Sequence, residues 1–83
     1  MANNERQWIN TQILKSKLLE VKELTDKNLR NYLVIRLEKL DGIFVFNSIV
    51  PESRWIELQE GKDYTFTIGE NDKGYLNLIE FSY

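Results

Sequence analysis

The stretch LRNYLVIRLEKLDGIFVFNS, residues 29–48, decides the fold. Two apolar runs flank Asp41-Gly42, a dipeptide that tolerates the positive φ of a tight hairpin turn. We therefore predict a β-hairpin with a two-residue loop, in which Arg36 pairs with Asn47. Because side chains alternate along a strand, one face of this hairpin forms a core. The predicted core face carries Leu33, Ile35, Leu37, Phe44 and Phe46.

The opposite face of the hairpin is the candidate working surface. In the two-residue register it carries Tyr32, Val34, Arg36, Glu38, Ile43, Val45 and Asn47. A three-residue loop is the alternative, with Lys39 opposite Ile43. That loop moves Phe44 and Phe46 to the outer face beside Arg36, because a shift of one residue exchanges the faces.

The amino-acid composition excludes several kinds of site and chemistry. The chain has 83 residues, enough for one small domain, and contains no Cys and no His. Disulfides, thiolate nucleophiles, common zinc sites and imidazole acid-base chemistry are thereby excluded, and we predict no catalytic activity and no cofactor. The first residues resemble no targeting signal, and no apolar run approaches the roughly twenty residues of a membrane span. The expectation is a soluble cytoplasmic protein.

Charge is distributed unevenly along the chain. Residues 1–50 contain eight Lys or Arg and six Asp or Glu, a net charge of +2, whereas residues 51–83 contain three and seven, a net charge of -4. A polyanion can therefore approach the N-terminal half, although the acidic chain lacks the strong overall positive field of many nonspecific DNA-binding proteins.

The segments before the hairpin allow two interpretations. Residues 1–10 are predicted to form an arm or a short helix, ahead of a domain that spans residues 11–83. Residues 11–24 fit a helix or a strand, and we favour the strand because an isolated hairpin needs a further strand to close a core. In that strand Leu19 and Val21 point inward, whereas Leu18, Glu20 and Lys22 point outward.

The C-terminal third predicts a short helix and two strands. Pro51 can start a helix over PESRWIELQ, with Trp55, Ile56 and Leu58 closing one end of the sheet. The segment GKDYTFTIG alternates with period two, so its inward residues are Tyr64, Phe66 and Ile68. In the final strand, YLNLIEFSY, we expect Leu76 and Leu78 inward and a bulge or twist that brings Ile79 or Phe81 to the core.

This order of elements resembles an OB-fold, an all-β five-stranded Greek-key barrel with the order β-β-β-α-β-β. The resemblance spans residues 13–82 and rests on LLEVKELTD, LVIRLEKLDGIFVF and LQEGKDYTFTIG. The last of these is similar to the Leu-x-x-Gly-x-x-Tyr-x-Phe entry of OB domains of the single-stranded DNA-binding and anticodon-binding type.

The resemblance implies that single-stranded nucleic acid, DNA in the first instance, lies across the outer face of the second and third strands. The flanking loops are residues 26–30 and 70–75. The implied contacts, of the kind found in replication or repair modules, are Lys27, Arg30, Tyr32, Arg36, Asn47, Lys73 and Tyr75. Aromatic rings stack on bases, and cations meet phosphates.

A protein partner or a second copy of the chain is the alternative occupant of the same face. Val34, Ile43 and Val45 would form an exposed apolar patch there, and such patches mark interfaces between proteins. In this alternative the domain is a subunit of an oligomer or a larger complex, without direct contact to nucleic acid.

Overall fold

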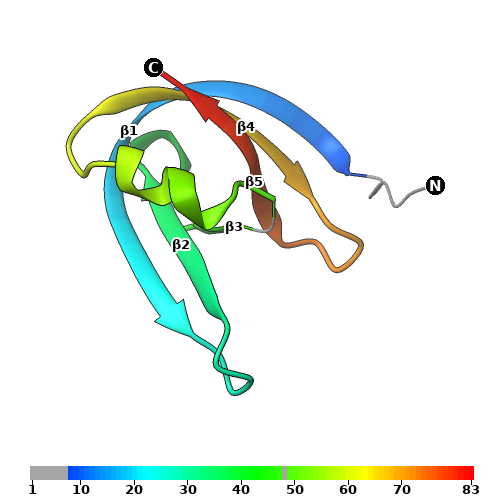
Figure 1. Ribbon diagram of the computed structural model, residues 1–83. Coiled ribbons are helices and arrows are strands. Elements are labelled where there is room, and N and C mark those ends of the chain that lie inside the picture. The colour runs from blue at the N-terminus through cyan, green and yellow to red at the C-terminus, as the bar shows by residue number, and fades with distance from the viewer. Residues whose placement is uncertain (1–7, 48) are drawn as a thin grey trace.

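Five strands close into a barrel with the neighbour order β1-β2-β3-β5-β4, in a computed structural model that describes residues 8–47 and 49–83 (Figure 1). The strands are β1 (Ile9–Thr25), β2 (Asn31–Leu37), β3 (Phe44–Asn47), β4 (Asp63–Glu70) and β5 (Leu76–Ser82). Two 3-10 helices, η1 (Glu38–Leu40) and η2 (Glu52–Glu57), interrupt them. All neighbouring strands are antiparallel except β3 and β5, which run parallel.

The predicted fold class, an all-β OB-fold barrel of five strands, is confirmed, but the helix expected between the third and fourth strands forms only as a 3-10 turn. The short helix is η2, a 3-10 helix of six residues. Of the predicted N-terminal arm, residues 1–7 lie outside the described residues. Within the part of the chain that the structure describes, no helix is long and apolar enough to cross a membrane.

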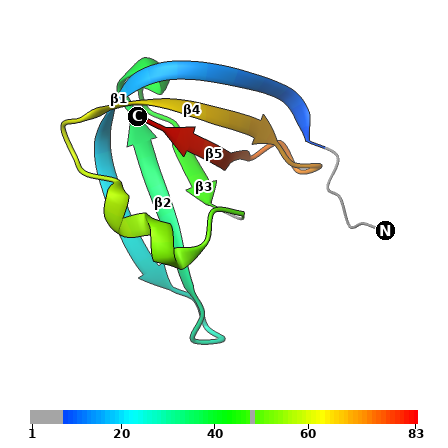
Figure 2. The same cartoon turned by 45° about the horizontal axis from the view of Figure 1, so that its top comes forward.

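β1 is one long curved strand that serves two neighbours, as Figure 2 shows. Its first half pairs with β4 and its second half with β2. The change occurs at Leu18, whose N–H donates to the Lys62 carbonyl (2.8 Å) and whose carbonyl accepts from the Gly61 N–H (2.7 Å). The strand interpretation of residues 11–24 is confirmed.

A β-bulge between Leu18 and Glu20 corrects one detail of that interpretation. Because a bulge adds a residue, the inward set passes from even to odd positions there. Leu18 is fully buried and Val21 packs against the core, so the predicted outward orientation of Leu18 is wrong. Glu20 and Lys22 lie outside, as expected, and form an ion pair.

The predicted two-residue loop of the hairpin is also wrong. β2 and β3 pair with Arg36 opposite Phe44 and Val34 opposite Phe46, and the connection contains η1. This register puts Val45 in the core, where its exposed fraction is 0%, so the predicted place of Val45 in an outer interface is wrong as well. Phe44 and Phe46 lie on the outer face, as in the three-residue alternative, although the observed pairing differs from both registers.

The remaining core follows the predicted alternation. Tyr64, Phe66 and Ile68 of β4 are buried, and a register shift between β4 and β5 at Ile79 lets Phe81 reach the interior. Among the described residues, the buried cluster consists of Leu18, Leu33, Ile35, Leu37, Val45, Val50, Leu58, Tyr64, Phe66, Ile68, Leu78 and Phe81.

η2 packs against one part of this core and leaves another part of its surface outside. Trp55 and Leu58 pack on the core, and the Trp55 Nε1–H donates to the Val50 carbonyl (3.1 Å). Ile56 is 83% exposed, so its predicted role in closing the barrel is wrong. A 3-10 helix has three residues per turn, which directs neighbouring side chains to different sides.

Candidate functional site

An apolar, aromatic surface covers the outside of β2 and β3 and the neighbouring end of β1. The register brings it together, because Lys22 lies opposite Val34, which lies opposite Phe46, while Leu24 lies opposite Tyr32. We call this surface the aromatic face. Its members are Leu24, Tyr32, Val34, Ile43, Phe44, Phe46 and Tyr75.

Two shallow hollows meet at the phenylalanines of the aromatic face. One, of about 240 Å³, extends to Tyr32 and Leu24, and the other, of about 340 Å³, extends to Tyr75. Phe44 is 48% exposed and Tyr75 is 57% exposed. The Phe46 and Tyr75 rings meet edge to face, with centroids 5.9 Å apart. The Phe44, Phe46 and Tyr75 rings thus line one hollow, from β3 to the residue that precedes β5.

The β1–β2 tip (residues 26–30) and the β4–β5 tip (residues 71–75) project from the barrel (Figure 1). The first tip adjoins Leu24 and Tyr32 of the aromatic face, and the second contains Tyr75. In the first tip, Asp26 Oδ1 accepts the N–H groups of Asn28 (2.8 Å) and Arg30 (2.9 Å). In the second, Asn71 Oδ1 accepts those of Lys73 (2.9 Å) and Tyr75 (3.0 Å). These side-chain bonds fix the backbone of each tip, since Asp and Asn satisfy the donors of a tight turn.

The cations at the face fall into two groups. Arg36 and Lys22 share Glu20, with the Arg36 Nε 2.8 Å from Glu20 Oε1 and the Lys22 Nζ 3.6 Å from Oε2. The hydrogen bond from Arg36 lowers the pKa of Glu20, so this carboxylate is charged at neutral pH. In the second group, Lys27, Arg30 and Lys73 are exposed on the hairpin tips and form no ion pair within residues 8–47 and 49–83.

The structure gathers most of the site residues that the sequence predicted. Tyr32, Ile43 and Tyr75 lie on the aromatic face, and Arg36 lies at its border. Val34 lies at its centre but is only 6% exposed. The predicted cations of the tips, Lys27, Arg30 and Lys73, are exposed beside it.

Asn47 has a different environment from the one expected of a base contact. Its Nδ2–H donates to the Val50 carbonyl (2.7 Å), and its Oδ1 accepts the Val50 N–H (3.0 Å). Both ends of the amide therefore stabilise the turn that follows β3.

Three members of the aromatic face were missing from the predicted site, Leu24, Phe44 and Phe46, and so was the adjacent cation Lys22. The three-residue alternative for the hairpin loop could have identified Phe44 and Phe46 as site residues, because it gives both side chains the outward orientation that the structure shows. Leu24 and Lys22 follow from the outward orientation of Glu20, since residues of a strand two apart share a face.

The rest of the described chain offers no group of three or more acidic side chains arranged to hold a metal ion. No protein-family model matches the sequence, and no curated protein matches it either. A functional proposal for this barrel therefore rests on its fold and on the chemistry of its surface.

Proposed function

We propose that this protein binds single-stranded nucleic acid, DNA in the first instance, across the aromatic face and between the two hairpin tips. Binding is the whole of the proposed activity, without a catalytic step. The observation that carries the proposal is the row of outward-facing rings formed by the exposed Phe44 and Tyr75 and the half-buried Phe46. Base–aromatic stacking contributes about 1–3 kcal/mol per base and tolerates any sequence, because every base has a π-face.

The arrangement of charge supports the same proposal. Lys27 and Arg30 lie on one tip and Lys73 on the other, so a strand that crosses the rings meets a cation at each border. Asp72 lies beside Lys73, and Glu20 neutralises part of the charge of Arg36 and Lys22. We therefore propose a modest affinity with few phosphate contacts and a shallow dependence on salt.

The fold lends further support as an analogy. In OB-folds the face of the second and third strands and the loops around it commonly take oligonucleotides or oligosaccharides. The same fold serves many purposes, so the analogy raises the weight of the proposal without replacing the argument from the rings.

Fluorescence anisotropy with a labelled oligothymidylate at low salt tests the proposal. Phe44→Ala removes a ring that is 48% exposed, and we expect the affinity to fall about tenfold, in line with one lost stacking contact. Ile13→Ala is the matched control, because Ile13 is 73% exposed on the part of β1 that pairs with β4. A folded wild-type protein that leaves the oligonucleotide unbound at low salt would refute the proposal.

A protein interface is the second candidate, favoured by the exposure of Leu24 (40%) and Ile43 (44%) on the same face. Neither side chain has a chemical reason to meet phosphate, and apolar side chains of this kind are common at interfaces. Light scattering separates the candidates. An oligomer that Ile43→Glu dissociates, together with oligonucleotide binding that Phe44→Ala leaves unchanged, would favour the interface.

A further inference from the structure

We propose a second binding site, a pocket between η2 and the β1–β2 ladder that takes an arginine or lysine side chain from a basic segment of a protein partner. Its volume is about 470 Å³, within the range of pockets that hold small ligands. Its lining residues are Val21, Glu23, Leu33, Glu52, Trp55 and Ile56. None of them belongs to the aromatic face, so this site goes beyond the proposed function.

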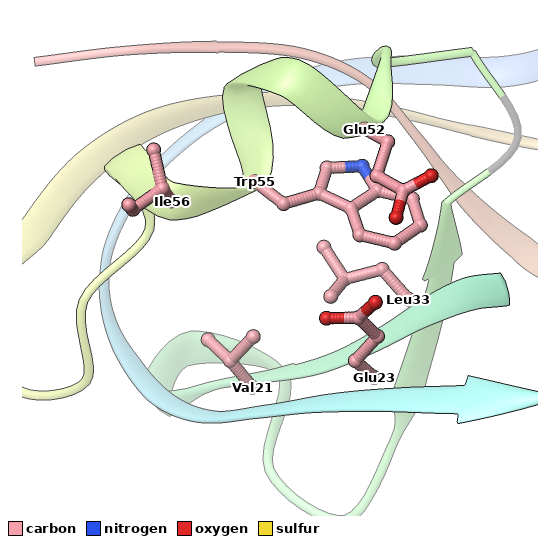
Figure 3. A pocket seen from close by; sticks show the side chains of 6 residues that line it. All are labelled: Val21, Glu23, Leu33, Glu52, Trp55 and Ile56. Carbon is pink, nitrogen blue, oxygen red and sulfur yellow. The ribbon is translucent and has the colours of Figure 1, made fainter.

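Three kinds of surface meet in the pocket, as Figure 3 shows. Val21 and Leu33 form an apolar floor on β1 and β2, and the Trp55 indole stands above it on η2. The Glu23 carboxylate points from β1 toward η2, and the Glu52 carboxylate points from η2 toward the strands. The Trp55 Nε1–H is held by the Val50 carbonyl, which fixes the indole in this position.

The two carboxylates lack a cation within the part of the chain that the structure describes. Its ion pairs engage Glu20, Glu57 and Glu80, but neither Glu23 nor Glu52. Glu52 accepts one neutral hydrogen bond, from Asn31 Nδ2 (3.3 Å). Glu23 and Glu52 thus bring two negative charges to the lining of one pocket.

This combination specifies the occupant. A bare metal ion gains nothing from the indole and the apolar floor, whereas an arginine or lysine has an aliphatic stem for the floor and a cationic end for the carboxylates. A cation near an indole gains about 0.5–1 kcal/mol at an exposed site, from its attraction to the ring. Charge complementarity therefore points to a basic peptide, and nucleic acid is repelled from this side.

Nuclear magnetic resonance of the ¹⁵N-labelled full chain, without DNA, tests the site. The titrant is the capped peptide Gly-Arg-Gly-Arg-Gly, and the readout is the indole N–H of Trp55, with the Trp8 indole as an internal reference. We expect a saturable shift of the Trp55 signal, and none with the neutral peptide Gly-Gln-Gly-Gln-Gly. No saturable shift at millimolar peptide would overturn the proposal.

Two double variants separate the pocket from general electrostatics. Glu23→Gln with Glu52→Gln should weaken peptide binding about tenfold, as expected for the loss of two charge contacts. Glu38→Gln with Asp63→Asn removes the same charge from exposed positions outside the pocket and should leave the affinity unchanged. Thermal melts establish that both variants fold. If both double variants weaken peptide binding equally, the binding depends only on the net charge of the protein, and the proposed site is refuted.

Two further measurements test whether the ligand is a peptide and whether the pocket binds it independently of the aromatic face. Guanidinium chloride should bind far more weakly than the peptide, and equal affinity would overturn the assignment to a peptide. Phe44→Ala should bind the peptide like the wild type, because Phe44 lies outside the pocket. A failure of DNA binding and a failure of peptide binding are thereby told apart.

Discussion

Leu29 and Gly74 occupy the same position in two hairpin tips that share one hydrogen-bond pattern. The Leu29 N–H donates to the Asp26 carbonyl and the Gly74 N–H to the Asn71 carbonyl, each at 3.0 Å. Both residues have a positive φ, 63° at Leu29 and 88° at Gly74. Glycine adopts this conformation freely, whereas a leucine is strained in it. The leucine side chain is 84% exposed, so burial does not offset the strain.

Leu29→Gly should therefore stabilise the protein. The left-handed conformation destabilises the folded protein by about 1–2 kcal/mol when the residue is leucine. Glycine removes this strain, but its greater conformational freedom in the unfolded chain offsets about 0.4–1 kcal/mol of the gain. We expect the free energy of unfolding to rise by about 0.5 kcal/mol, a shift of about 2–4 °C in the midpoint of thermal unfolding for a domain of this size. Circular dichroism melts measure it.

Leu29→Ala is the matched control, because alanine removes the same exposed side chain and keeps the strain. Its stability should stay near that of the wild type. Gly74→Ala is the converse, and it should lower the free energy of unfolding by about 1 kcal/mol, because it introduces the strain at the second tip. An equal gain from Leu29→Ala and Leu29→Gly would attribute the effect to the exposed side chain and not to the backbone.

The parts of the fold that local pattern controls were predictable. Tyr64, Phe66 and Ile68 alternate without interruption, and β4 contains them with all three inward. The final strand was predictable in part. A change of face is needed to bury both Leu78 and an odd-numbered residue, but the sequence left Ile79 and Phe81 as alternatives, and the structure buries Phe81.

The hairpin loop was not predictable from local pattern, since a distant residue takes part in it. Ser16 on β1 accepts the Lys39 N–H of η1 (3.1 Å), and Leu40 of η1 packs against the core. These contacts override the preference of Asp41-Gly42 for a two-residue loop. They decide that Phe44, and not Val45, stands on the outer face, so the composition of the candidate site depends on a contact 23 residues apart in the sequence.

Ser16→Ala should consequently destabilise the hairpin connection. The Ser16 hydroxyl is buried, accepts the Lys39 N–H and donates to the Lys17 carbonyl (3.0 Å). Its loss leaves the Lys39 N–H without that partner, which costs about 1–3 kcal/mol. Urea denaturation measures the change, with Ser53→Ala at an exposed position of η2 as the control. Equal midpoints for the two variants would contradict the role of Ser16.

The Glu80 carboxyl makes the free energy of unfolding depend on pH. The Phe81 backbone N–H (2.9 Å) and Arg54 Nη1 (2.6 Å) both donate to Glu80 Oε1, and they lower the pKa of this carboxyl below its ordinary value of 4.5. A pKa depressed by folding contributes stability that is fully present above the unfolded value. That contribution is lost as the pH falls through the folded pKa.

Glu80→Gln should therefore flatten the loss of stability between about pH 5 and pH 3, because glutamine does not titrate. The measurement is a series of urea unfolding curves across this range. Asp63→Asn removes an exposed carboxylate that has no ion pair within the described residues, and its curve should keep the steeper wild-type slope. A Glu80→Gln slope equal to that of the wild type would contradict the assignment.

Glu20 limits the positive charge at the border of the aromatic face. It pairs with Arg36 and with Lys22, and both cations point away from the barrel interior beside the rings. Glu20→Gln releases them, so under the proposed function the affinity for oligothymidylate should rise about two- to fivefold at low salt. The gain should shrink as salt is added, because salt screens exposed charges over about 10 Å at 0.1 M ionic strength.

The salt dependence of the same titration shows whether the released cations meet phosphates. For a single strand, the logarithm of the affinity falls with the logarithm of the salt concentration by about 0.7 for each phosphate contact, so Glu20→Gln should steepen the slope by about 0.7–1.4. Adding Arg36→Gln to Glu20→Gln should remove part of that gain. Asp63→Asn changes the net charge equally at a distant position, and an equal rise in affinity there would assign the effect to net charge. Two results together would indicate that Lys22 and Arg36 contact the bound DNA strand. The affinity should rise with Glu20→Gln but not with Asp63→Asn, and it should fall again when Arg36→Gln is added to Glu20→Gln.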